Sequence, residues 1–149
     1  RAAPRTGFTI IGGRPARAVQ RLGQRPGIRV TGFVDDVLAE LAAADLFVAP
    51  LRIARGVQNK VLEALAFGLP VVATPQALEG IDAEPDRHLL VAGDPDGFAA
   101  AVLSLLQRPE QARAMGQAAR RHMAGRYHWD QALAPLTDVF RVPERVGMA

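Results

Sequence analysis

Cysteine is absent from the 149-residue sequence, and aromatic side chains are few, with six Phe, one Trp and one Tyr. Without cysteine the chain can form no disulfide and no thiolate metal site. No apolar run approaches the ~20 residues that a membrane-spanning helix needs. The first residues are polar and include no apolar stretch of the kind found in secretory signals. These absences predict a cytoplasmic protein.

Lysine is nearly absent too, because the basic residues are 17 Arg and a single lysine, Lys60. The net charge is +3, and a high isoelectric point such as this chain's can indicate a nucleic-acid partner. Here the arginines are scattered and no aromatic residues are interleaved with them, so we expect no nucleic-acid partner. Hydrophobic residues at 49% and charged residues at 22% are typical of a soluble globular domain.

What the sequence does have is an alternation of short β-branched runs with longer alanine- and leucine-rich segments. Five strands are predicted, at Phe8–Gly12, Ile28–Phe33, Leu46–Leu51, Pro70–Pro75 and His88–Ala92. Helices are predicted at residues 14–22, 35–45, 58–68, 94–108, 109–127 and 128–140. Strands that alternate with helices and are apolar throughout indicate a parallel sheet covered on both faces. We therefore expect one Rossmann-like α/β domain over residues 1–149.

Several of the predicted helices have capping residues at their ends. The pair Asp35 and Asp36 precedes the second helix and supplies an N-cap. Asp94 has the same role for the fifth helix, with Pro95 at its first position. Gly68 is a natural residue to end the third helix.

In sheets of this kind, ligands bind beyond the carboxyl ends of the strands. The loop and helix after the third strand, "RIARGVQNKVLEALAFG", contain the only lysine of the chain. On a helical wheel we expect the core-facing arc to hold Val61, Leu62, Leu65 and Ala66, and the opposite arc to hold Lys60, Glu63, Ala64 and Phe67.

Lys60 and Glu63 are three residues apart, so they are neighbours near the start of this helix. Free N–H groups and the helix dipole attract an anion there, and Lys60 adds a cation that can reach phosphate oxygens. Glu63 would repel phosphate but can accept hydrogen bonds from sugar hydroxyls, so the two residues together predict a nucleotide ligand. The alternative is an exposed ion pair worth a few tenths of a kcal/mol. Two observations favour a nucleotide site over an exposed ion pair. The rest of the helix is apolar, and the chain has lysine here although it otherwise uses arginine.

The segment "RGVQNKVLEALAFGLPVVATP" resembles the signature region of the family 4, or group 1, glycosyltransferases, enzymes of the GT-B fold. The segments "VTGFVDDV", "AADLFVAPL", "FAAAVLSLLQRPEQARAMGQAAR" and "YHWD" also resemble the family, so the likeness runs from about Phe8 to Phe140. The wording "PLRIARGVQNKVLEA" is most similar to sugar transferases associated with bacterial exopolysaccharide and protein-sorting clusters. The resemblance implies a C-terminal domain that binds a nucleotide-sugar donor and supports sugar transfer with retention of configuration.

The resemblance also implies roles for individual residues of the loop and helix. Glu63 matches the glutamate that holds the donor ribose in the family. Gly56 and Val57 match the loop that meets the diphosphate and the sugar, and Asn59 and Lys60 follow it at the start of the helix. We expect these residues to bind the donor.

The strand end near the base of the donor is matched by Gly32, Phe33 and Val34. One departure from the family concerns the first glutamate of its usual pair, because that position is Arg55 here. We expect Arg55 and Lys60 to be the catalytic candidates, with Lys60, backbone amides and the helix dipole stabilising the leaving diphosphate. No metal and no cofactor other than the donor substrate is expected.

A second departure is length, since family members are about twice as long or more, as two domains require. The resemblance implies that the N-terminal acceptor domain is missing, together with a first strand and helix before Arg1. That acceptor domain is the expected partner, and the longer protein is expected to act at the inner face of the membrane. The helix around Trp129 to Phe140 would pack across to it. Without this domain, the chain is expected to be inactive as an enzyme.

Other functions remain open. A related GT-B nucleotide-sugar epimerase is one alternative, and a nucleotide-sugar-binding domain without turnover is another, motivated by Arg55. A receiver domain would explain Asp35 and Asp36 after a strand, but it needs a lysine after the fifth strand, and none follows Lys60.

Two further patterns are weak. The segment "IGGRPA" lacks the third glycine of a dinucleotide-binding fingerprint. His88, His122 and His128 are far apart in the sequence, and we expect each to be isolated from the others and from acidic partners, hence structural or exposed rather than catalytic.

Overall fold

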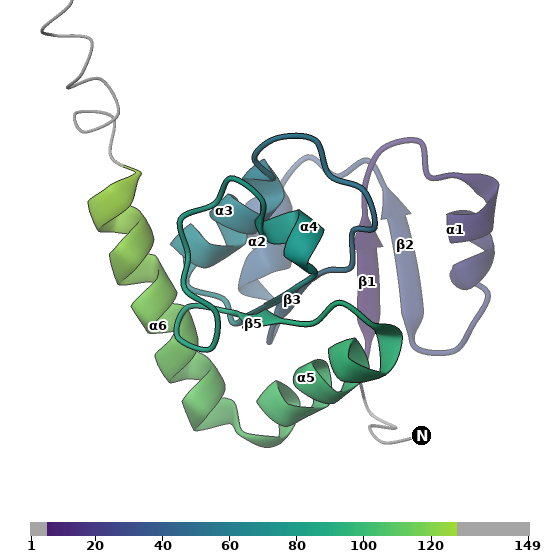
Figure 1. The fold of residues 1–149 in the computed structure, drawn as a ribbon. Helices are drawn as coiled ribbons and strands as arrows, with labels where there is room; N and C mark the ends of the chain where they lie inside the picture. Colours follow the sequence, from purple (N-terminus) through teal and green to yellow (C-terminus); the bar gives the residue numbers. More distant parts are fainter. Residues whose placement is uncertain (1–5, 128–149) are drawn as a thin grey trace, which may run out of the picture.

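The computed structural model describes residues 6–127 (Figure 1). The elements follow one another as β1 (Phe8–Ile11), α1 (Arg17–Leu22), β2 (Ile28–Gly32), α2 (Val37–Ala42), β3 (Phe47–Ala49), α3 (Asn59–Phe67), β4 (Val71–Ala73), α4 (Pro75–Leu78), β5 (Leu90–Val91), α5 (Pro95–Gln107) and α6 (Pro109–Arg126). The helix predicted for residues 128–140 lies outside the described residues, as does His128.

The strands form two parallel sheets rather than the single sheet predicted. β1 pairs with β2, with Phe8 opposite Ile28, and β3, β4 and β5 form the second sheet in that order. Figure 1 shows α1, β1 and β2 on one side of the molecule and α6 along the opposite side. The predicted α/β class with parallel strands is confirmed. The hydrophobic pattern identifies strands but does not determine which strand edges pair, so the division into two sheets was not predicted.

The three-stranded sheet is buried on both faces, as its uniformly apolar strands predicted. Val71 and Ala73 of β4 face a core cluster formed with α3, α4 and α6, in which Leu65 is completely buried. Val72 faces the other way, into a second cluster formed with α5 and the first half of α6. This burial makes the sheet a rigid base for the loops at its carboxyl edge.

The capping signals in the sequence are confirmed by hydrogen bonds. The Ala39 N–H donates to Asp36 Oδ1 at 3.0 Å, and the Gly97 N–H donates to Asp94 Oδ1 at 2.8 Å. Gly68 ends α3 in the left-handed conformation, with φ of 91°.

Helix α4 was missed because Pro75 was read as the end of a strand and its other three residues were assigned to no element. Thr74 is its N-cap and Pro75 its first residue, a Thr-Pro pair that indicates a helix start. The predicted strand Pro70–Pro75 was therefore too long. No helix among residues 6–127 is both long enough and apolar enough to cross a bilayer.

Candidate functional site

The loop between β3 and α3 leaves the sheet at its carboxyl edge and leads into the start of α3. Gly56 has φ of 70°, which a side chain would strain. Gln58 is the N-cap residue, but its side chain donates to the Gly56 carbonyl oxygen at 3.0 Å and makes no capping bond. The Val61 N–H donates to the Gln58 carbonyl oxygen at 2.9 Å, so the amides at the start of α3 that remain available to a ligand are those of Asn59 and Lys60.

Lys60 and Glu63 lie together at this helix start, as the spacing predicted. Lys60 Nζ donates to Glu63 Oε2 at 3.0 Å and to Oε1 at 3.3 Å. The side chains are 68% and 44% exposed, so without a ligand the two residues form a solvated ion pair. Their proximity is established by the structure, and donor binding by either residue stays a prediction.

The two faces of α3 differ in part from the predicted wheel. Ala64 was placed on the outer arc but is completely buried, and Ala66 was placed on the core arc but is exposed. The reason is that α3 packs against two neighbours, the sheet and α6, so its buried arc is turned toward α6. Lys60 and Glu63 are outside this arc, as predicted.

Contacts from both ends of α4 also hold the β3–α3 loop, and sequence reasoning missed them. The Thr74 hydroxyl donates to the Leu51 carbonyl oxygen at 2.7 Å and so holds the beginning of the β3–α3 loop. Gly80, which follows α4 with φ of 76°, lies so close to Val57 that a Cβ there would be 3.1 Å from Val57 Cγ2. The glycine itself was the available signal, because glycine is favoured where backbones approach closely.

The other predicted donor-binding residues lie at the end of β2. Gly32 has φ of 74°, and Phe33 is 79% exposed, which leaves its ring available to a ligand. Val34 is half-buried. The Gly32 carbonyl oxygen accepts from the Gly12 N–H at 3.1 Å, so the ends of β1 and β2 are held together.

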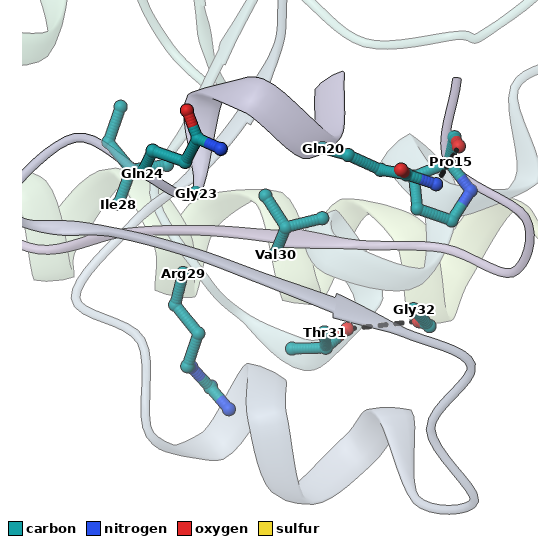
Figure 2. A pocket seen from close by; sticks show the side chains of 9 residues that line it. All are labelled: Pro15, Gln20, Gly23, Gln24, Ile28, Arg29, Val30, Thr31 and Gly32. Carbon is teal, nitrogen blue, oxygen red and sulfur yellow. Dashed lines mark hydrogen bonds between the residues drawn. The ribbon is translucent and has the colours of Figure 1, made fainter. Parts of the chain in front are cut away.

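A cavity of about 640 Å³ lies between α1 and β2 (Figure 2). Of the predicted site residues only Gly32 lines it. Arg29 also lines it, but its guanidinium is bound to Glu40. A second cavity of about 430 Å³ is lined by α5, α6 and the α2–β3 and α3–β4 connections, including Asp45 and Arg113. Neither cavity is lined by Lys60 or Glu63, so the prediction for those residues rests on the helix start alone.

The remaining predicted residues are on the surface of the same loop. Arg55 and Asn59 are exposed, and they share the segment from residue 55 to residue 60 with Gly56 and Lys60. Among residues 6–127 no group of three His, Asp or Glu side chains is arranged to hold a metal ion.

The expectation that the histidines are isolated was wrong for two of them. The rings of His88 and His122 stack with centroids 4.4 Å apart, and His122 Nε2 lies 2.7 Å from the Asp82 carbonyl oxygen. The fold brings these residues together from the α4–β5 connection and from α6, which no local pattern in the sequence could indicate. His88 is buried and its Nδ1 accepts from the Glu84 N–H at 3.0 Å, so it has a structural role.

Comparison with known proteins identifies the family. The family model described as "Glycosyl transferases group 1" matches residues 1–108. The chain belongs to the group 1 glycosyl transferases. It is 30% identical over 97% of its length to a GDP-mannose-dependent monoacylated alpha-(1-6)-phosphatidylinositol monomannoside mannosyltransferase of Corynebacterium glutamicum. It is 34% identical over 85% of its length to a D-inositol 3-phosphate glycosyltransferase of Corynebacterium urealyticum.

Solved structures of glycosyltransferases share the fold of this group 1 chain. Sucrose-phosphate synthase from Thermosynechococcus elongatus superposes with a TM-score of 0.81 at 21% identity, over 93% of this chain and 38% of that one. Anabaena Alr3699/HepE in complex with UDP superposes with a TM-score of 0.76 at 18% identity, over 92% and 42%. The chain spans 41% and 28% of the lengths of the two curated relatives named above.

Proposed function

We propose that this chain is the donor-binding domain of a retaining glycosyltransferase whose donor is a nucleoside-diphosphate sugar. The observation that carries the proposal is the start of α3, where amides without a side-chain cap adjoin the Lys60–Glu63 pair at the carboxyl edge of the sheet. Membership of the group 1 family supports it, and so does the fold shared with a protein solved in complex with UDP.

The ion pair suits a ligand site better than a role in stability. An exposed pair on a helix surface contributes only about 0.2–0.5 kcal/mol. A diphosphate would compete with Glu63 for Lys60, since phosphate and carboxylate are both anions. Once Lys60 binds the diphosphate, the Glu63 carboxylate becomes available to accept hydrogen bonds from ribose hydroxyls. Before the donor binds, the ion pair thus holds Lys60 near the proposed diphosphate site and Glu63 near the proposed ribose site.

Catalysis would depend on charge stabilisation of the leaving group. Breaking the bond between the sugar and the diphosphate leaves negative charge on the diphosphate oxygens. Lys60, the free amides of α3 and the helix dipole would stabilise that charge. Arg55 is exposed on the same loop and is a second cation for this role, where the resemblance would place a glutamate.

The acceptor would be bound by a part of the protein that this chain does not include. We infer an N-terminal acceptor domain, and with it a peripheral association of the longer protein with the cytoplasmic face of a membrane. The product would be a bacterial glycoconjugate or exopolysaccharide. Mannosyltransferases that act on phosphatidylinositol mannosides are among the relatives, which supports an acceptor at a membrane surface.

The direct test is calorimetry of the chain with UDP, GDP and ADP and with the corresponding nucleosides. Lys60→Ala is expected to weaken nucleoside diphosphate binding roughly 10- to 100-fold, the loss of one charge-assisted hydrogen bond, and to leave nucleoside affinity unchanged. Glu63→Ala is expected to weaken both kinds of ligand, because both carry the ribose.

A matched control is the Arg87–Glu84 pair. It is also an exposed i,i+3 ion pair, with 2.9 Å between Arg87 Nη1 and Glu84 Oε2, but it belongs to the α4–β5 connection and not to α3. Arg87→Ala and Glu84→Ala are expected to bind like the parent. If the Lys60 and Glu63 variants also bind like the parent, their pair is only a surface ion pair and the proposal is wrong.

Arg55 favours a second candidate, a domain that binds or epimerises the donor without transferring its sugar. The longer protein, incubated with donor and candidate acceptors, separates the possibilities. Transferred sugar supports the main proposal, whereas an epimerised donor or binding without turnover supports the alternative.

A further inference from the structure

Three groups from the end of α6 converge on one residue of the α4–β5 connection, Asp82. The Asp82 N–H donates to Tyr127 Oη at 2.7 Å. The Asp82 carbonyl oxygen accepts from His122 Nε2 at 2.7 Å, which means that His122 carries a hydrogen on Nε2, since a carbonyl can only accept. Its carboxylate accepts from Arg126 Nε at 2.6 Å. Both backbone groups and the side chain of Asp82 are thus bound to the same helix.

The segment next to Asp82 is fixed on two further sides. Ile81 is buried in the core cluster shared by α3, α4 and α6. Gly80 is in contact with Val57, and the contact is too close to admit a larger residue without displacement. Residues 80–82 therefore connect the end of α6 to the β3–α3 loop.

The hydrogen bonds on Asp82 contribute more to position than to stability. Its carboxylate and the Arg126 side chain are 55% and 64% exposed, and ion pairs so exposed contribute little to folding. Bonds to both backbone groups of one residue do, however, fix the path of the chain at that point. Displacement there would move Gly80, and with it the surface against which Val57 rests.

We propose that Asp82 is a positioning residue for the donor site, a role that rests on the function proposed above. By joining the end of α6 to the Gly80–Val57 contact, it fixes the loop that would receive the diphosphate. Asp82 does not touch the donor itself, and it acts through Val57.

The test compares amide hydrogen exchange at residues 53–58 in the 149-residue chain and in the variants Asp82→Asn and Tyr127→Phe. Tyr127→Phe removes the acceptor of the Asp82 N–H, and Asp82→Asn removes the charge that pairs with Arg126; neither adds bulk. Exchange at residues 53–58 is expected to accelerate roughly threefold to tenfold in Tyr127→Phe, which loses a bond to the backbone of residue 82, and less in Asp82→Asn, which keeps both backbone bonds. Affinity for UDP or GDP, whichever the parent binds, is expected to weaken by a similar factor, while affinity for the nucleoside stays unchanged.

Two controls separate positioning from general loosening. Arg87→Gln breaks an exposed ion pair in the same connection that does not involve α6, and it is expected to leave exchange at residues 53–58 unchanged. Arg126→Lys keeps a cation beside Asp82 and is expected to behave like the parent. The effect of Tyr127→Phe on affinity is expected to shrink when Val57→Ala is also present, because the contact that transmits it is then reduced.

The outcomes distinguish this inference from the proposed function. Unchanged exchange at residues 53–58 in both Asp82→Asn and Tyr127→Phe, with a parent that binds nucleoside diphosphate, overturns the role of Asp82 alone. A parent that binds no nucleoside diphosphate overturns the proposed function, and with it the assignment of Asp82 to a donor site.

Discussion

His88 is a buried titratable side chain whose surroundings favour its neutral form. Burial lowers the pKa of His88, and the nearby His122 and Arg87 lower it further, while Glu84 and Asp82 act in the opposite direction. Its Nδ1 accepts a hydrogen bond from the Glu84 N–H, which a doubly protonated ring could not do. Acid should therefore disturb the α4–β5 connection at this residue.

The first prediction concerns stability as a function of pH. In the unfolded chain the pKa of His88 is close to the ordinary histidine value of 6.5, whereas in the folded chain it is lower. Between the two values the unfolded state binds more protons, so the free energy of unfolding falls as the pH falls below about 6.5. Chemical unfolding between pH 7.5 and pH 5 measures this loss.

The control variant is His88→Gln, whose amide oxygen can accept the same hydrogen bond but does not titrate. We expect a smaller loss of stability between pH 7.5 and pH 5 than in the parent. Equal losses in the two proteins would show that other groups cause the acid sensitivity.

The contacts of some residues could be predicted from the sequence, and those of others could not. Lys60 and Glu63 are neighbours on one helix, and helical geometry alone predicts that they meet. The contacts of Asp82 join it to residues 40 to 45 positions away in the sequence, so only the folded chain shows them. The same is true of the stacked rings of His88 and His122.

At the scale of elements, α3 and α6 pack unusually closely at one point. A Cβ at Gly116 of α6 would overlap the carbonyl oxygen of Gly68 and lie 2.9 Å from its carbonyl carbon. Both atoms belong to the backbone, so neither can move aside without shifting one of the helices. The contact is made possible by glycine, and it holds the C-terminal end of α3 against α6.

A matched pair of substitutions in α6 tests this packing. Gly116→Ala is expected to lower the free energy of unfolding by about 1–3 kcal/mol or more, because the helices must separate. Gly125→Ala makes the same change where nothing lies within 4 Å, and it is expected to stabilise the chain by about 0.5–1 kcal/mol through helix propensity. Urea unfolding measures both, and similar values for the two variants would contradict the packing argument.

Elements were predictable where local chemistry determines them. The caps at Asp36, Asp94 and Gly68 form as expected, because each depends on residues within one helical turn. Helix α4 was missed because its four residues are too few to show a helical period. The division into two sheets could not be predicted, since strand pairing depends on contacts between segments that are distant in the sequence.

At the scale of the whole molecule, the chain is about two fifths as long as the mannosyltransferases of Corynebacterium and Mycobacterium to which it is similar, covering 41% and 39% of them. The carboxyl edge of its three-stranded sheet leads to the start of α3, where the donor is proposed to bind. The function proposed above places the acceptor on a separate domain. Binding and transfer should therefore be separable in experiments.

The last prediction follows from that separation. The chain alone is expected to bind nucleoside diphosphate and to leave a nucleoside-diphosphate sugar intact, because catalysis also requires an acceptor held in line with the bond that breaks. Release of nucleoside diphosphate from UDP-glucose and GDP-mannose, measured with and without simple sugar and glycolipid acceptors, tests this. The longer protein, assayed in parallel, is expected to release it only with the acceptor present. Transfer by the chain alone would show that residues 1–149 already contain the acceptor site.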